Sequence, residues 1–210
     1  MSTPELIYFT DPMCSWCYGF SPVIDALAQR YGERLPVRLV LGGLRPGNSK
    51  PMNAQTAAEL RGHWTHVAEA SGQDFADCAI DTAGFVYDTD PAARAVALAR
   101  RTGKALALDY LRAAHRAFYV RGLDLTSRDV LADLAAELGQ DRATVRAGLD
   151  EPDLSEETLS DYNTSQNAGV AGFPTLIIGP NADGTFAMVT RGFNSLEPVT
   201  AKIDQWLAAN

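Results

Sequence analysis

The hydrophobic pattern of the first fifty residues predicts two strands with a helix between them. Residues 6–10 are rich in β-branched and aromatic side chains, which is typical of a strand. Residues 14–31 place apolar side chains on one face of a helix, at Phe20, Ile24, Leu27 and Tyr31. Pro22 lies inside this helix and predicts a kink. Residues 37–41 predict the second strand, which a Gly-Gly pair closes.

The middle of the chain, from about Asn53 to Asp150, is rich in alanine and has little strand signal. We predict four to six helices here. Asp90 is the expected N-cap of one of them, because Pro91 follows it at the first helical position, and Gly103 is expected to end that helix.

Strand patterns return near the C-terminus. Asp153 or Ser155 is expected to cap a helix, and residues 176–178 form a short apolar run that predicts a buried strand. A turn rich in Pro, Asn, Asp and Gly separates it from a hairpin partner at residues 186–190. Residues 199–207 predict a closing amphipathic helix. The predicted order is β-α-β, a helical block, then α-β-β-α.

Composition narrows the possible partners. The 210 residues include 26 Asp and Glu against 18 Lys and Arg, for a formal net charge of −8. Binding to a phosphate backbone or an anionic membrane surface needs basic clusters, and the sequence has none. No apolar stretch approaches the roughly 18 residues of a membrane span, and the N-terminus lacks the pattern of a signal peptide. We expect a cytoplasmic protein that binds neither nucleic acid nor membranes.

Two of the three cysteines form a C-x-x-C pair, Cys14 and Cys17, at the start of the first predicted helix. This spacing brings both sulfurs to one side of the first helical turn. Free N–H groups and the helix dipole favour a thiolate there. We therefore predict that Cys14 has a lowered pKa and attacks disulfides, and that Cys17 is the resolving thiol. In a reducing compartment such a pair is catalytic or metal-binding rather than structural.

A zinc site is the alternative for this pair, and it would need two more ligands. The candidates are His63, His66 and Cys78, but His63-x-x-His66 is tighter than the usual spacing. We predict no metal. We interpret the two histidines as part of a solvated helix face. The alternative is that they line the groove beside the thiols. Cys78 is interpreted as a buried apolar residue, with a third redox thiol as the alternative, and His115 as a core histidine.

The segment Phe9-Thr10-Asp11-Pro12-Met13-Cys14-Ser15-Trp16-Cys17 resembles the active-site entry of thioredoxin-fold proteins, and Pro22 lies where thioredoxins carry a kinking proline. Residues 172–210 resemble the C-terminal half of thioredoxins. A helical insertion after the second strand is the DsbA-like arrangement. The Cys-Ser-Trp-Cys-Tyr run is similar to the FrnE-like branch of that family, which contains predicted protein-disulfide isomerases.

The resemblance implies an α/β thioredoxin fold with a large all-helical insertion. It implies a discontinuous thioredoxin domain of residues 1–48 and 153–210, and an insertion subdomain of residues 49–152. It also implies that the peptide bond before Pro174 is cis and packs against the cysteine pair. The backbone of Phe173 would then pair with a substrate peptide while its ring faces the substrate groove. An ordinary trans proline opening a strand is the alternative.

The chain departs from the family at several positions. Many members have a buried acid six residues before the first cysteine, and this chain has Tyr8 there. Proton transfer from the second cysteine would use water or another carboxylate such as Asp11, or turnover would be slow. The Ser15-Trp16 dipeptide matches neither thioredoxins nor the strong oxidants of the fold. We expect Trp16 to be partly exposed toward substrate, and Thr175 to support the site by hydrogen bonding or simply to form strand.

We predict a dithiol–disulfide oxidoreductase that exchanges or isomerises protein or small-molecule disulfides, with no bound cofactor and with glutathione as a candidate co-substrate. The alternative is a glutathione-dependent transferase or isomerase of the kappa or 2-hydroxychromene-2-carboxylate isomerase type. Such relatives carry serine at the first catalytic position and no dithiol. A third hypothesis is a peptide-binding or chaperone-like protein without redox chemistry. The sequence sets neither the oligomeric state nor the direction of electron flow.

Overall fold

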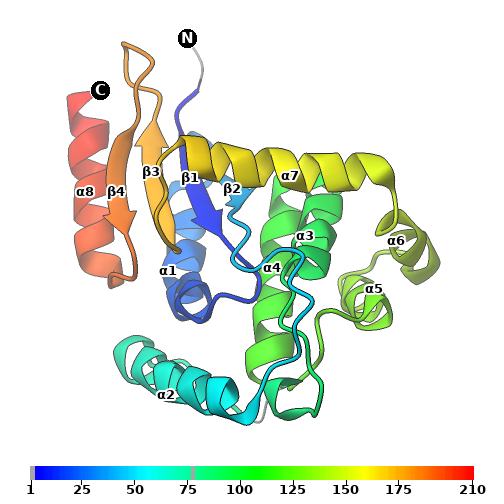
Figure 1. Cartoon of the computed structure of the whole chain (residues 1–210). Helices are drawn as coiled ribbons and strands as arrows, with labels where there is room; N and C mark the ends of the chain where they lie inside the picture. Colours follow the sequence, from blue (N-terminus) through cyan, green and yellow to red (C-terminus); the bar gives the residue numbers. More distant parts are fainter. Residues whose placement is uncertain (1–2, 77–78) are drawn as a thin grey trace.

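The computed structural model describes residues 3–76 and 79–210 (Figure 1). Its first part comprises β1 (Glu5–Thr10), α1 (Ser15–Tyr31), the 3-10 turn η1 (Gly32–Arg34) and β2 (Val37–Leu41). The helical insertion comprises α2 (Ala54–Ser71), the 3-10 turn η2 (Ala79–Asp81), α3 (Asp90–Thr102), α4 (Lys104–Tyr119), α5 (Arg128–Glu137) and α6 (Arg142–Gly148). The last part comprises α7 (Pro152–Asn167), β3 (Thr175–Gly179), β4 (Ala187–Arg191) and α8 (Leu196–Ala209).

The strands form one mixed sheet in the order β2-β1-β3-β4. β1 runs parallel to β2 and antiparallel to β3, and β3 runs antiparallel to β4. Because β1 and β2 are parallel, the loops after Thr10 and Leu41 leave the sheet at the same edge. Phe9 pairs with Thr175 on β3, so the loop before β3 reaches that edge as well. Three loops distant in sequence therefore meet at one place.

The alternation of side chains along β1 divides the core between two faces of the sheet. Leu6 and Tyr8 belong to the large buried cluster that includes α1 residues such as Phe20 and Ile24. Ile7 and Phe9 point to the opposite face, into a smaller cluster completed by Val40, Val170, Phe173 and Ile177. Both faces of β1 are thus covered, which explains its almost continuous apolar sequence.

The helical insertion shares the large buried cluster with the thioredoxin-like part. An ion-pair cluster also connects α3 to α7 and β2. The guanidinium of Arg100 binds Glu157 at 2.7 Å and Asp161 at 2.6 Å, and it donates to the Leu39 carbonyl at 3.1 Å. Asp161 in turn accepts from the Leu41 backbone N–H. In Figure 1, α7 extends from above the sheet to the helices of the insertion.

The predicted fold class and the order of the elements are confirmed, and the five α-helices found between residues 54 and 148 in the described chain fall within the predicted range. Two helix starts were predicted wrongly. Thr89, not Asp90, is the N-cap of α3. α7 begins at Pro152 after Glu151, upstream of both predicted caps, because proline at the first helical position starts the helix earlier. The predicted subdomain boundaries stay a prediction. No helix in the described ranges is both long and apolar enough to span a bilayer.

Candidate active site

The cysteine pair lies where β1 gives way to α1. Cys14 is the N-cap of α1, with extended backbone angles, and its N–H donates to the Asp11 carbonyl at 3.1 Å. The Cys14 carbonyl accepts from the Tyr18 N–H at 3.0 Å and begins the helix. Both cysteines are free thiols; Cys14 is 6% exposed and Cys17 is fully buried. A substrate can therefore reach Cys14 before it can reach Cys17.

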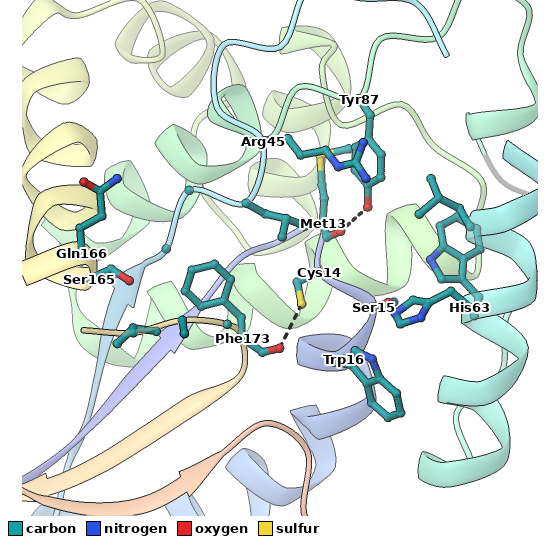
Figure 2. A pocket seen from close by; sticks show the side chains of 18 residues that line it. Met13, Cys14, Ser15, Trp16, Arg45, His63, Tyr87, Ser165, Gln166 and Phe173 are labelled. Carbon is teal, nitrogen blue, oxygen red and sulfur yellow. Dashed lines mark hydrogen bonds between the residues drawn. The ribbon is translucent and has the colours of Figure 1, made fainter. Parts of the chain in front are cut away.

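The loop before β3 faces the first thiol. The Phe173–Pro174 peptide bond is cis, as the resemblance implied. The Cys14 thiol donates to the Phe173 carbonyl at 3.8 Å, shown as a dashed line in Figure 2. Thr175 is buried and its hydroxyl donates to the Gly172 carbonyl at 2.8 Å, so it closes this loop instead of contacting the thiols.

A cavity of about 470 Å³ opens at Cys14, and we call it the active-site cavity (Figure 2). Its walls come from all three parts of the chain: the start of α1, the loop after β2, α2, the end of α7 and the loop before β3. Ser15, Trp16 and Phe173 line it, and their contact with substrate stays a prediction. The insertion thus supplies one wall of the site.

Trp16 is partly exposed and connects α1 to the insertion. Its ring lies 5.8 Å from the His63 ring in an edge-on arrangement and 5.7 Å from the ring of Phe193. His63 is exposed and lines the active-site cavity, so the alternative placement beside the thiols is the correct one for this residue. His66 is also exposed but does not line this cavity, in agreement with a solvated face.

Gly42, directly after β2, allows the close packing of Phe173. A Cβ atom added at Gly42 would lie 2.0 Å from Cζ of the Phe173 ring. The Gly42 N–H donates to the Thr10 carbonyl at 2.7 Å, which holds this loop against the end of β1. Glycine is needed here because the aromatic ring occupies the space of a side chain. The sequence alone identifies Gly42 only as the residue that ends the second strand.

Asp11 organises the backbone before Cys14. Its carboxylate is fully buried and accepts from the N–H of Met13 at 2.9 Å and from the N–H of Leu44 at 2.8 Å. Burial raises its pKa to about 6, although both backbone hydrogen bonds act in the opposite direction. Asp11 therefore joins the loop after β1 to the loop after β2, as a supporting residue.

The insertion holds the same loop through three side chains. His115 is buried, and its Nε2 lies 3.3 Å from the Asp11 carbonyl. The Tyr87 and Tyr119 hydroxyls both donate to the Met13 carbonyl, the latter at 2.6 Å. Burial lowers the pKa of His115 to about 4, so it is neutral near pH 7. His115 is thus a core histidine as predicted, although its Nδ1 has no partner in the described chain.

We expect Asp11 to make stability fall as pH rises from about 4 to about 6. Its pKa is higher in the folded state than in the unfolded chain, so the folded state binds the proton more tightly across that window. The stabilisation is complete at the acidic end and lost above pH 6. Relative to Asp11→Asn, the wild type should gain about 2 kcal/mol in unfolding free energy between pH 7 and pH 4.5. Urea denaturation of both proteins at both pH values measures this. A difference in unfolding free energy between the two proteins that is the same at pH 7 and pH 4.5 would contradict the prediction.

Tyr8 lies six residues before Cys14, where the resemblance implies a buried acid. Its hydroxyl is buried, with no hydrogen-bond partner in the part of the chain that the structure describes. Burial and the negative charge of a Cys17 thiolate raise its pKa well above the usual value. A phenol that stays protonated cannot accept the proton of Cys17. Tyr8 is therefore not a ready base for the second thiol, and water or Asp11 as the proton acceptor stays a prediction.

The prediction of a lowered Cys14 pKa is wrong for the reduced pair. Hydrogen bonding to Cys17, burial and the charge of a Cys17 thiolate all raise the pKa of Cys14. The Cys17 backbone N–H acts in the predicted direction, because a helix N-terminus favours the thiolate. The neighbouring thiol and the burial outweigh it. A pKa predicted from the helix N-terminus considers Cys14 alone and leaves out its interaction with Cys17.

The structure does not support the alternative of a metal site. Among residues 3–76 and 79–210, no group of three or more His, Cys, Asp or Glu side chains is placed to hold a metal ion. Cys78 lies outside the described residues, and its interpretation stays a prediction.

A thioredoxin-like sheet, a C-x-x-C pair at the start of α1 and a cis proline loop beside the first thiol define a thioredoxin-fold protein of the dithiol type. The DSBA-like thioredoxin domain matches residues 5–198, and the chain belongs to this family.

Solved structures agree with this assignment. A candidate protein disulfide isomerase from Nitrosomonas europaea is 30% identical, with a TM-score of 0.90 and full coverage of both chains. The cytosolic disulfide reductase DsbM from Pseudomonas aeruginosa is 27% identical, with a TM-score of 0.80, over 98% of this chain and 100% of that one. DsbM has also been solved with GSH.

Among curated proteins, the ClpXP adapter protein SpxH of Halalkalibacterium halodurans is 24% identical over 183 residues. The match covers 82% of this chain but 58% of that protein. The chain therefore spans little more than half the length of this relative.

Proposed function

We propose that the protein is a thiol–disulfide oxidoreductase that reduces disulfides with Cys14 and Cys17. The observation that carries this proposal is the difference between the two thiols. Cys14 is the slightly exposed one, lines the active-site cavity and faces the Phe173 carbonyl, whereas Cys17 is fully buried. This difference suits an attacking thiol and a resolving thiol.

The proposed chemistry consists of two exchanges. The Cys14 thiolate attacks one sulfur of a substrate disulfide, so that an S–S bond forms to Cys14 and the other half leaves as a thiolate that takes up a proton. The Cys17 thiolate then attacks Cys14, and the second half leaves in the same way. The substrate gains two electrons and two protons and becomes two thiols, while Cys14 and Cys17 become a disulfide. Two molecules of a thiol such as glutathione reduce the pair again and form one glutathione disulfide.

Glutathione is the proposed reductant because the site suits a small thiol. The active-site cavity, at about 470 Å³, is within the usual range for small-molecule sites. The 27% identical reductase DsbM has been solved with GSH. We further propose a cytosolic location, since a reducing compartment keeps such a pair in the thiol form that a reductase needs.

Two other functions remain as alternatives. The fold is shared with a 2-hydroxychromene-2-carboxylate isomerase, at 17% identity and a TM-score of 0.70, which supports the fold alone. The cysteine pair of this chain argues against that chemistry. The SpxH relatives are adapter proteins, so a binding role without chemistry is the second alternative.

A coupled assay tests the proposal. Bis(2-hydroxyethyl) disulfide, glutathione, NADPH and glutathione reductase are mixed, and NADPH oxidation is followed with and without the protein. We expect oxidation that depends on the protein and on Cys14. If the protein accelerates no disulfide reduction but conjugates glutathione to an electrophile such as 1-chloro-2,4-dinitrobenzene, the transferase alternative replaces the proposal.

A further inference from the structure

Arg45 lines two neighbouring hollows, one of which is the active-site cavity at Cys14. It is exposed, follows β2 in the loop that begins with Gly42, and lines the active-site cavity. It also lines a neighbouring hollow of about 270 Å³ that contains Lys50. Figure 2 shows Arg45 beside Tyr87 and Met13.

The charge of Arg45 is available to a ligand. Most arginines of the chain are ion-paired, but in the described ranges no carboxylate oxygen lies within 4.0 Å of Arg45 or of Lys50. The Arg45 guanidinium lies 5.0 Å from the centre of the Tyr87 ring. This cation–π contact orients the side chain without neutralising it.

Two acids near this loop, Asp11 and Asp88, accept hydrogen bonds from backbone groups. The Asp11 carboxylate accepts from the N–H groups of Met13 and Leu44. One Asp88 oxygen accepts from the N–H groups of Gly47 at 2.8 Å and of Asp90 at 3.0 Å. An exposed cation therefore lines the same cavity as the reactive thiol in a chain of net charge −8.

We propose that Arg45, assisted by Lys50, binds a carboxylate of the substrate and makes the site selective for anionic low-molecular-weight disulfides. This inference rests on the proposed function, in which Cys14 attacks a disulfide. A disulfide whose halves carry carboxylates can place a sulfur at Cys14 and a carboxylate at Arg45. Guanidinium groups form charge-assisted, bidentate hydrogen bonds with carboxylates, which fix orientation as well as add affinity.

The test compares three disulfides of different charge under single-turnover conditions. The fully reduced protein is mixed with glutathione disulfide (anionic), bis(2-hydroxyethyl) disulfide (neutral) or cystamine (cationic), and oxidation of the pair is followed by tryptophan fluorescence. In Arg45→Gln, we expect the rate with glutathione disulfide to fall about tenfold. The neutral disulfide should keep its rate and cystamine should react faster. Rising salt should slow only the anionic substrate in the wild type.

Arg34→Gln is the matched control, because Arg34 is exposed, lies outside both hollows and gives the same change in net charge. It should leave all three rates unchanged. The Arg45→Gln backbone can keep its hydrogen bond to the Thr89 hydroxyl. Equal slowing of all three disulfides, or no slowing of the anionic one, would overturn the inference. A wild type that no disulfide oxidises would instead overturn the proposed function.

Discussion

Replacing Cys14 with serine is expected to abolish disulfide reduction, with a loss of more than about a thousandfold, because a hydroxyl cannot replace a thiolate as nucleophile. Cys14 is the thiol that lines the active-site cavity, and Cys17 is fully buried and cannot substitute for it. The coupled glutathione assay measures the loss.

Cys17→Ser is the control for Cys14→Ser, and we expect it to trap an intermediate instead of losing the first reaction. Cys14 remains, so the first exchange proceeds, but no resolving thiol follows. The protein should accumulate as a mixed disulfide that mass spectrometry detects as one added glutathionyl group on Cys14. Full reductase activity in Cys14→Ser would contradict the role of Cys14 as the nucleophile, and a glutathionyl group on Cys17 would reverse the assigned roles.

Gly42→Ala should damage both the stability and the site. The added methyl group would overlap the Phe173 ring, with Cβ 2.0 Å from Cζ and 2.1 Å from Cε1. The ring must move, and Phe173 is the residue whose carbonyl faces Cys14. Overpacking of this kind costs about 1–3 kcal/mol. We expect a lower unfolding free energy in urea and slower disulfide reduction.

Two controls separate this clash from a general effect of alanine. Gly62 lies in α2, is exposed, and has no neighbouring atom within 4 Å of the position that a Cβ would take, so Gly62→Ala should stabilise the protein by about 0.5–1 kcal/mol. Adding Phe173→Ala to Gly42→Ala should recover part of the lost stability, because the ring no longer occupies the space. Additive losses in the double variant would contradict the steric explanation.

The residues that sequence could identify share one property: their chemistry is local. The Cys14–Cys17 spacing after a strand and before a helix predicts the thiol pair directly. Pro174 is predicted by resemblance to a motif whose parts are adjacent in sequence. The cis bond agrees with that expectation, and the Cys14 thiol contacts the carbonyl of the residue before it, Phe173.

The walls of the cavity depend on packing between distant segments, which periodicity does not reveal. In the sequence Gly42 is no more than a strand stop, and only the fold brings the Phe173 ring beside it. Tyr87 and Tyr119 resemble ordinary core aromatics, although both hydroxyls donate to the Met13 carbonyl. A signal was present for the loop after β2, because the ends of parallel strands meet at one edge of the sheet and ligands bind there.

The pKa of Cys14 shows how local reasoning can give the wrong direction. A cysteine at a helix N-terminus is expected to have a lowered pKa. In the fold, the hydrogen bond to Cys17 and the burial of both thiols raise it instead. The sequence contains both cysteines, but their burial together is a property of the packed core.

The redox equilibrium of the pair in glutathione buffers tests the central claim most directly. The protein is titrated across ratios of glutathione to glutathione disulfide while tryptophan fluorescence is followed, since Trp16 lies between the two cysteines. We predict a single two-electron transition that disappears in Cys14→Ser. Two thiols that stay free at every ratio would contradict the account, because a dithiol reductase must pass through its disulfide form.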